Sequence, residues 1–329
     1  MKPQTCIRNK GDALILVTGA TGWVGNAFVQ RLLAGDAHQG VVVALRRDLK
    51  QWPRYVRSCV TGDMLATTNW CNALKNVSAV VHCAARVHVM HDKESDPLTA
   101  FRAVNVQGTL NLARQTASAG VKRFVFISSV KVNGEFTLPG HPFYETGTPN
   151  PQDAYGLSKL EAELGLHQIA ADTGMELVII RPPLVYGPGV KANFASLMSV
   201  VQKGWPLPLG AVQNQRSLVA LDNLVDFIVT CITHPKAANQ TFLISDGQDL
   251  STTELVQGMA QAADLPARLL PVPVWALEWA GRLVGKADVI QRLCGNLQID
   301  SSKARELLDW VPKISVQEGL RRAMNGNVK

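Results

Sequence analysis

Tyr155 and Lys159 stand four residues apart at the start of a segment with helical spacing. Residues at i and i+4 share one face of a helix, so the two side chains are expected to lie together. A phenol with an ordinary pKa of about 10 is a poor acid or base at neutral pH, but a nearby ammonium favours the phenolate and lowers that pKa. The pair predicts a tyrosine that transfers protons and is tuned by a lysine. The alternative is a tyrosine stacked on a lysine stem at a solvated surface.

A serine is the natural third member of such a group. Ser129 follows the apolar run 123–127, and its hydroxyl can hold the substrate oxygen that Tyr155 protonates or deprotonates. Ser128 competes for this role, and either serine can instead form a hydrogen bond at the end of a strand. We assign the role to Ser129.

The elements that must position these groups begin with a glycine-rich turn between a predicted strand and a predicted helix. Glycines let the backbone turn sharply and approach a pyrophosphate, and the helix N-terminus offers N–H groups to it. The alternative, an ordinary glycine-rich turn, is less consistent with this position. The residues predicted to bind a dinucleotide here are Gly19, Thr21, Gly22, Trp23, Val24 and Gly25.

The next strand indicates which dinucleotide. Its run 41–45 ends in Arg46 and Arg47, where an arginine suits the 2′-phosphate of NADP. If both arginines are solvated and Asp48 binds the ribose, the cofactor is NAD. We predict NADP and keep NAD open.

Short apolar runs alternate with longer helical patterns, which predicts βαβ units. The strands are expected at 13–17, 41–45, 77–83, 123–127, 176–180, 218–221 and 241–245, and the helices at 23–33, 98–119, 153–172 and mostly beyond 251. The prediction is an α/β fold: a Rossmann-type doubly wound parallel sheet with a smaller, mostly helical C-terminal substrate domain. We place the nucleotide-binding domain at 12–181 plus 217–245, and the substrate domain at 182–216 plus 246–329.

The composition argues against several classes of protein. Of the 329 residues 47% are hydrophobic and 18% charged, which is typical of a globular protein. Apolar runs fall short of the roughly 20 residues that cross a bilayer, and the segment 1–11 lacks a signal-peptide core. We therefore expect a cytoplasmic protein with no transmembrane segment. Its six scattered cysteines indicate reduced thiols, and we expect no metal site. Despite a net charge of +7, no nucleic-acid motif is present, so we expect a phosphorylated ligand and no nucleic acid.

Taken together, the motifs resemble the extended short-chain dehydrogenase/reductases, the NAD-dependent epimerase/dehydratase family. The resemblance covers nearly the whole chain, in the family's order. It rests on Gly19-x-x-Gly22-x-x-Gly25, Gly62-Asp63, His82-Cys83-Ala84-Ala85, Asn105-Val-x-Gly108-Thr109, Ser128-Ser129, Tyr155-x-x-x-Lys159 and Arg181-Pro182-x-x-Val185-Tyr186-Gly187-Pro188.

The resemblance implies further roles. Asp63 would hold the adenine amino group, and Lys159 the nicotinamide ribose. Arg216 resembles the arginine that grips the diphosphate in UDP-galactose 4-epimerases, a role that a guanidinium fork suits. Asn193 resembles a diphosphate- or sugar-contacting asparagine, and Leu207 lies in a loop that resembles the uracil-side loop. The other cofactor-binding residues expected on this basis are Met64, Ala84, Ala85, Asn105, Pro182 and Val185.

The segment from Ser128 to Gly134 resembles bacterial enzymes of surface-polysaccharide synthesis, including those of lipopolysaccharide O-antigens, which act at C4 of UDP-N-acetyl-hexosamines. It departs from the epimerase pattern, which has a small hydroxyl residue near Lys131 and an aromatic residue near Asn133. We expect Lys131 to face the sugar, as Arg86 and His88 also could. The first hypothesis is reduction of UDP-4-keto-6-deoxy-N-acetylglucosamine, and the second is a UDP-glucose or UDP-N-acetylglucosamine 4-epimerase.

Two other activities are disfavoured. A 4,6-dehydratase needs an acid and a base where this chain has Val130-Lys131. A non-catalytic NADPH sensor on the same fold would lose the Tyr-Lys pair.

Apolar residues on predicted helices indicate which partners the protein could bind. Helices 98–119 and 153–172 carry apolar residues beyond one face, and the family pairs these helices across a two-fold axis, which implies a homodimer. The apolar stretch at Trp275, Leu277, Trp279, Leu283 and Val284 is expected to pack in the core or the substrate domain, with weak membrane association as the alternative.

Overall fold

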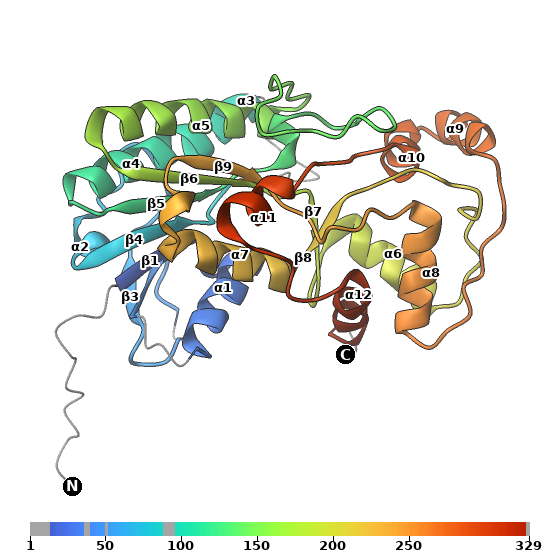
Figure 1. Cartoon of the computed structure of the whole chain (residues 1–329), viewed down its shortest axis with the longest axis horizontal. Helices are drawn as coiled ribbons and strands as arrows, with labels where there is room; N and C mark the ends of the chain where they lie inside the picture. The colour runs from blue at the N-terminus through green and yellow to red at the C-terminus, as the bar shows by residue number, and fades with distance from the viewer. Residues whose placement is uncertain (1–13, 36–39, 50–51, 88–95, 327–329) are drawn as a thin grey trace, which may run out of the picture. The chain divides into compact units, whose positions relative to one another are not determined.

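The computed structural model describes residues 14–35, 40–49, 52–87 and 96–326. Its main sheet has seven strands in the order β3-β2-β1-β4-β5-β6-β9 (Figure 1). The pairs from β3 to β5 are parallel. The strand order reverses between β1 and β4, the arrangement of a doubly wound dinucleotide-binding sheet. The predicted fold class is confirmed. The strands are β1 (Leu14–Thr18), β2 (Val41–Leu45), β3 (Arg57–Val60), β4 (Val77–His82), β5 (Arg123–Ile127), β6 (Glu176–Arg181) and β9 (Gln240–Leu243).

The chain divides into two compact units. The first contains residues up to Ile127, Ser158–Ile179 and Ala238–Gln240, and the second contains Ser128–Leu157, Ile180–Ala237 and the residues from Thr241 onward. This division groups 128–157, 180–181, 217–237 and 241–245 with the second unit, whereas the sequence assigned them to the nucleotide-binding domain. The predicted domain bounds stay a prediction.

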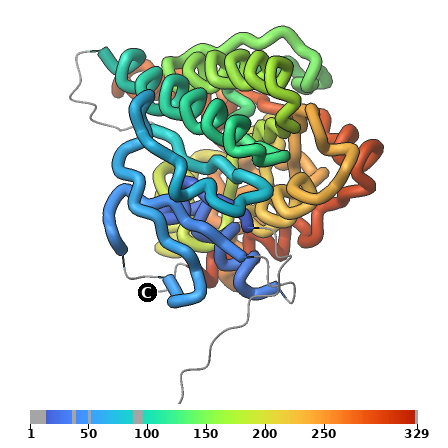
Figure 2. Tube along the Cα trace, turned by 90° about the vertical axis from the view of Figure 1, so that its left-hand side faces the viewer, coloured from blue at the N-terminus to red at the C-terminus, as the bar shows by residue number. Residues whose placement is uncertain are grey.

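The first unit is built around strands that are apolar along their whole length. All five residues of β1, β2 and β5 are buried, because helices cover the sheet on both faces. In Figure 1, α1 (Trp23–Leu33) lies on one face, and α4 (Thr109–Ser118) and α5 (Ala154–Thr173) lie on the other. Figure 2 shows α4 and α5 side by side. They approach closely, since a Cβ on Gly165 of α5 would lie 2.6 Å from Leu110 Cδ2 of α4.

The helix expected at 98–119 is not uniform. It comprises α3 (Pro97–Phe101), a π-helical segment at Arg102–Gly108 and α4. A π segment adds a residue to the turn, and such segments often occur at functional sites. Leu164 of α5 is 61% exposed. The proposed pairing of these helices in a homodimer stays a prediction.

The second unit has a small sheet and most of the shorter helices. Its two-stranded sheet pairs β7 (Leu184–Tyr186) with β8 (Leu218–Ala220) in parallel. The strand expected at 218–221 therefore forms outside the main sheet, because β7 provides its partner. The helices are α6 (Ala192–Gln202), α7 (Leu221–Thr233), α8 (Thr252–Ala262), α9 (Val274–Leu283), α10 (Ala287–Cys294), α11 (Ser302–Leu308) and α12 (Val316–Asn325). The short helix α2 (Cys71–Leu74) belongs to the first unit.

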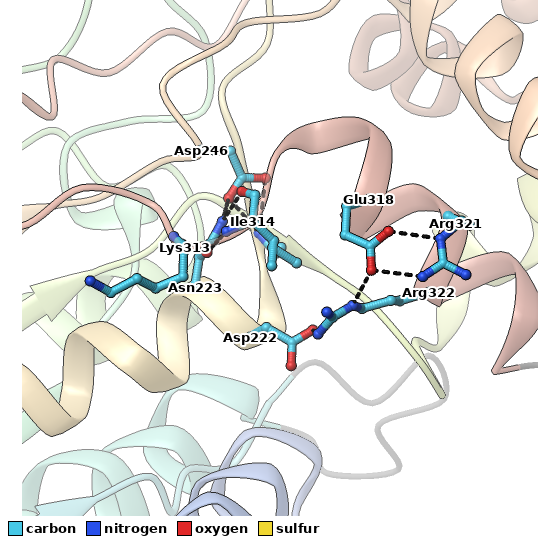
Figure 3. Close-up of polar contacts among 9 residues, drawn as sticks. Asp222, Asn223, Asp246, Lys313, Ile314, Glu318, Arg321 and Arg322 are labelled. Atoms are coloured by element: carbon cyan, nitrogen blue, oxygen red, sulfur yellow. Dashed lines mark hydrogen bonds and ion pairs between the residues drawn. The ribbon is translucent and has the colours of Figure 1, made fainter.

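Asn223 of α7 fixes the segment that leads into α12 (Figure 3). Its side chain accepts from the backbone N–H of Lys313 and Ile314, and it donates to Ile314 O and to Asp246. Asp246 also accepts from the Tyr186 hydroxyl at 2.7 Å and from Ala220 N. This buried network ties β7, β8, α7 and α12 into one unit. Hydrogen bonds of this kind hold the second unit together where it lacks a large sheet.

The apolar stretch on α9 is largely exposed, contrary to expectation. Trp275 is 72% exposed, Trp279 65%, Leu283 66% and Val284 67%, whereas Leu277 is 7% exposed. Positions 275, 279 and 283 recur every four residues, so one helix face bears them. The core-packing expectation was wrong for these four residues, because α9 packs on its opposite face through Leu277 and Gly281.

Candidate active site

The glycine turn after β1 has the geometry that the sequence predicts. Gly19 has φ +69°, and Gly22 N donates to Gly19 O at 2.8 Å. A Cβ on Gly19 would lie 2.6 Å from Ala84 N, and a Cβ on Gly25 would lie 2.2 Å from Gly19 O. Glycine is therefore required at both positions. The contact between Gly19 and Ala84 also joins the ends of β1 and β4, where ligands of such sheets bind.

The N-terminus of α1 fits a pyrophosphate. Gly22 is its N-cap and supplies no side-chain cap, and the first turn contains no acidic residue. Helix N–H groups in this position attract anions through hydrogen bonds and the helix dipole. Thr21 and Gly22 are exposed, whereas Trp23 and Val24 are half-buried. These residues would hold the dinucleotide, as the sequence predicts.

His82, at the end of β4, is a structural residue that the sequence analysis did not single out. Its Nδ1 lies 2.6 Å from Thr18 Oγ1, and its Nε2 lies 2.9 Å from Thr109 Oγ1. Burial, aided by the positive charge of Lys159, lowers the pKa of His82 to about 3. The imidazole is therefore neutral and links β1, β4 and α4 beneath the glycine turn. The only sequence signal was its place in the His82-Cys83-Ala84-Ala85 run.

Asn105 of the π segment braces the loop after β4. Its Oδ1 accepts from Arg86 N, and its Nδ2 donates to Arg86 O and to Ser158 Oγ. The amide thus fixes this loop through its acceptor and one donor, and its other donor anchors it to Ser158 of α5. Ala84 and Ala85 of the loop are half-buried. The Arg86 guanidinium lies 5.9 Å from the Phe101 ring centroid. His88 lies outside the described residues.

The adenosine-side residues differ in exposure. Arg46 and Arg47 follow β2 directly and are exposed, as is Asp63. Met64 is 9% exposed and belongs to the apolar core, and a Cβ on Gly108 would lie 2.5 Å from its carbonyl oxygen. Arg46, Arg47 and Asp63 are accessible to a ligand, whereas the Met64 side chain is committed to packing.

Lys159 is buried in the first unit. Its Nζ donates to Ile127 O at 2.8 Å and lies 4.5 Å from the Phe126 ring centroid. Burial lowers the pKa of Lys159 to about 8, and the Glu163 carboxylate acts against that shift. Cys83 is half-buried, and desolvation of its thiol raises the pKa of Cys83 to about 12, which keeps the thiol protonated.

Ser129 and Lys131 lie together in the second unit. Ser129 caps the 3₁₀ turn Val130–Val132, and its Oγ accepts from Lys131 N at 3.2 Å. It is half-buried, whereas Ser128 is 3% exposed. The choice of Ser129 for substrate contact stays a prediction. Val130 N donates to Pro182 O at 3.0 Å, so the loop from Pro182, which leads to half-buried Val185, abuts this turn.

Tyr155 lies in the first turn of α5, and Lys159 follows one turn later. Burial and then the Asp153 carboxylate raise the pKa of Tyr155. The protein alone therefore opposes the expected lowering by Lys159 and the nicotinamide. At neutral pH this tyrosine is a protonated phenol that can donate a proton.

Three expected UDP-sugar contacts also lie in the second unit. Arg216 donates through Nη1 to the carbonyl oxygens of Arg292 and Gly295, both at 2.9 Å, and burial lowers its pKa. Leu207 exchanges backbone hydrogen bonds with Arg268 and Leu270. Asn193 is exposed in the first turn of α6. Their predicted contacts with a UDP-sugar stay predictions.

The sheet order and the glycine turn at its switch point define a dinucleotide-binding enzyme fold. A model of the NAD dependent epimerase/dehydratase family matches residues 15–245. The chain is 53% identical over 309 residues to a UDP-glucose 4-epimerase of Vibrio cholerae, which covers 94% of this chain and 93% of that protein. This protein therefore belongs to the NAD dependent epimerase/dehydratase family, as its motifs predict, and is an enzyme of that family.

The chain also resembles more distant proteins, in sequence or in fold. The chain is 27% identical over 324 residues to the N-acetyl-α-D-glucosaminyl-diphospho-ditrans,octacis-undecaprenol 4-epimerase of Escherichia coli O157:H7, covering 94% of each chain. The fold of this chain matches that of the UDP-N-acetylglucosamine 4-epimerase of Bacillus cereus with a TM-score of 0.76 at 20% identity, over 95% of this chain and 98% of that one. The UDP-glucuronic acid 4-epimerase of B. cereus, solved with NAD, gives a TM-score of 0.75 at 21% identity, with 95% and 98% covered. Within the described part of the chain, no helix is long and apolar enough to span a membrane.

Proposed function

We propose that this enzyme transfers hydride at C4 of a UDP-linked hexosamine, and that it reduces a UDP-4-keto-6-deoxy-N-acetylglucosamine. The observation that carries C4 redox chemistry is helix α5, which bears Tyr155 in its first turn and Lys159 one turn later. The glycine turn and α1 would hold the dinucleotide, with Arg46 and Arg47 at its adenosine end. When bound, the nicotinamide supplies the hydride.

Residues of this chain would bind and protonate the C4 oxygen. Reduction of a carbonyl needs one hydride at carbon and one proton at oxygen. Tyr155 donates that proton from its phenol, and Ser129 Oγ orients the carbonyl by a hydrogen bond. Both residues belong to the second unit. Lys159 follows one helical turn later in the sequence, and an ammonium at that spacing would favour the phenolate that remains.

Two features support reduction over epimerisation. Asn133 is not free to replace the aromatic residue of epimerases, because it donates to Tyr144 O and accepts from Arg181. The exposed arginines after β2 suit NADPH, which a reductase takes up for each turnover.

UDP-sugar 4-epimerisation is the second candidate. The observation in its favour is the 53% identity to the V. cholerae protein. The same groups would oxidise C4 and return hydride to the other face of the keto-sugar.

One experiment separates the two. Purified protein is analysed for its bound nucleotide and then given either UDP-4-keto-6-deoxy-N-acetylglucosamine with NADPH, or UDP-glucose and UDP-N-acetylglucosamine without added cofactor. We expect NADPH-dependent formation of the 4-hydroxy product and little bound NAD. Interconversion of the 4-epimers by protein carrying tightly held NAD would assign the epimerase instead. No turnover in either assay would reject C4 chemistry.

A further inference from the structure

Lys131 contacts Ser129, one of the two groups that the proposed reaction places on the C4 oxygen, and Asp153, which lies two residues before the other group, Tyr155. Its backbone N–H donates to Ser129 Oγ at 3.2 Å, and its ammonium donates to Asp153 Oδ2 at 2.5 Å. Asp153 stands two residues before Tyr155. All four residues lie in the second unit.

Asp153 also controls how the helix of Tyr155 begins. Its backbone oxygen accepts the first helical hydrogen bond, from Leu157 N at 2.9 Å, and its Oδ1 accepts from Gly156 N at 2.7 Å. This is the geometry of a side chain that caps a helix N-terminus. One carboxylate therefore links the ammonium of Lys131 to the turn that contains Tyr155.

The backbone of that turn rests on Lys131 as well. A Cβ on Gly156 would lie 2.8 Å from Lys131 O and 3.2 Å from Asp153 Oδ1. Only glycine allows so close an approach between the helix start and the 3₁₀ turn. The distance between Ser129 and Tyr155 therefore depends on contacts made by Lys131.

The charges around Lys131 argue against its expected contact with the sugar. Its Nζ also donates to Glu135 Oε1 at 2.9 Å, so two carboxylates surround one ammonium. Burial acts to lower the pKa of Lys131, but Asp153 and Glu135 outweigh it and raise that pKa. The cation stays charged at neutral pH and is already paired. Without it, the two carboxylates would repel each other.

We propose that Lys131 is a positioning residue: it fixes Tyr155 relative to Ser129 by holding Asp153, the cap of α5, while its own N–H holds the serine hydroxyl. The inference rests on the proposed function for what the two groups do. It assigns Lys131 a role through Asp153 rather than a contact with substrate.

The test compares K131M, K131R, D153N and the double variant K131M/D153N with the wild type. K303M is the matched control, since Lys303 is another half-buried lysine of the second unit, with Nζ on Thr241 O at 2.9 Å. We measure kcat and KM for the UDP-sugar as functions of pH, together with amide exchange of residues 150–160. Asparagine keeps a capping oxygen at 153, so D153N leaves the helix cap in place while it removes the charge.

We expect K131M to lower kcat at least ~10-fold, with KM within about twofold of the wild type. The Asp153 carboxylate, no longer paired, raises the pKa of Tyr155 further, so the pH dependence of kcat moves to higher pH. Amide exchange at the start of α5 rises in K131M. K131R and K131M/D153N recover most of the loss, and K303M changes none of these quantities.

Two results would overturn the inference. If K131M raised KM at unchanged kcat, and K131M/D153N did not reverse that rise, Lys131 would be a substrate-binding residue. Unchanged exchange at 150–160 in K131M would show that Lys131 does not hold the helix start. The exchange measurement needs no turnover, so a wild type that is inactive on every UDP-sugar rejects the proposed function and leaves this test intact.

Discussion

The two units hold their predicted functional residues in different ways. In the first, the glycine turn is defined by backbone: Gly19 and Gly25 have no room for a Cβ, and the N–H groups of α1 face the expected phosphate. In the second, the Lys131 N–H holds the Ser129 hydroxyl, and the Lys131 ammonium contacts the Asp153 side chain, 22 residues away and two residues before Tyr155. A binding site made of backbone depends on few residue identities, whereas a site made of side chains depends on each contact.

This difference separates mutational effects. Changes in the first unit should alter cofactor affinity through backbone fit. Changes in the second should alter turnover or UDP-sugar affinity through single side-chain atoms.

The largest effect is expected at Tyr155. Y155F removes only the oxygen that transfers the proton, so we expect turnover to fall at least ~100-fold while cofactor affinity changes little. Steady-state kinetics and dinucleotide binding by fluorescence measure the two quantities. Wild-type turnover by Y155F would remove Tyr155 from the mechanism.

The matching change in the first unit is G25A. Its Cβ would lie 2.2 Å from Gly19 O, and forcing open so tight a turn costs about 1–3 kcal/mol. We expect dinucleotide affinity to fall about 10–100-fold by calorimetry. G35A is the control, because its Cβ would meet nothing closer than 3.7 Å. Equal affinities for G25A and G35A would refute a cradle built from backbone.

Arg216 tests the second unit at a distance from Tyr155. R216A should weaken UDP-sugar binding by at least ~2 kcal/mol, the scale of a charge-assisted diphosphate contact. R292A is the control, since the Arg292 carbonyl that accepts from Arg216 is retained in it. If R216A lowered the melting temperature and left UDP affinity intact, its contacts with Arg292 and Gly295 would be its whole role.

The smallest effect concerns cofactor choice in the first unit. The wild type should bind NADPH more tightly than NADH, and R46D/R47A should reverse the order. A carboxylate accepts the ribose hydroxyls but repels the 2′-phosphate. A lost charged hydrogen bond of about 1.5–3 kcal/mol gives a switch of at least ~10-fold. R54A, which removes another exposed arginine between β2 and β3, should leave the preference unchanged. Tighter NADH binding by the wild type would contradict the NADP assignment.

The sequence predicted the first unit well because apolar runs and glycine spacing, which identify its strands and its turn, are local features of the chain. Buried parallel strands are continuous apolar runs, so β2 and β5 begin and end at the expected residues. The turn at Gly19 was predicted from its place between a strand and a helix. The short strand β3 was missed, since alternate residues of it are exposed and it has no apolar run.

The elements and contacts that the sequence did not predict depend on residues far apart in the chain. Helices α6 and α7 were hidden by the surrounding prolines and by the strand-like run before Asp222. Nothing near Lys131 in the sequence indicates Asp153 as its partner, 22 residues away. The exposed face of α9 was likewise not predictable, because the same apolar spacing serves a buried helix equally well.

The most direct test of C4 reduction follows the hydride itself. NADPH deuterated at the transferred position is supplied with UDP-4-keto-6-deoxy-N-acetylglucosamine, and the product is analysed by NMR. We predict one deuterium at C4 of the sugar, incorporated at a rate that Y155F reduces at least ~100-fold. Deuterium at another carbon, or a sugar without deuterium, would contradict hydride transfer to C4 by this enzyme.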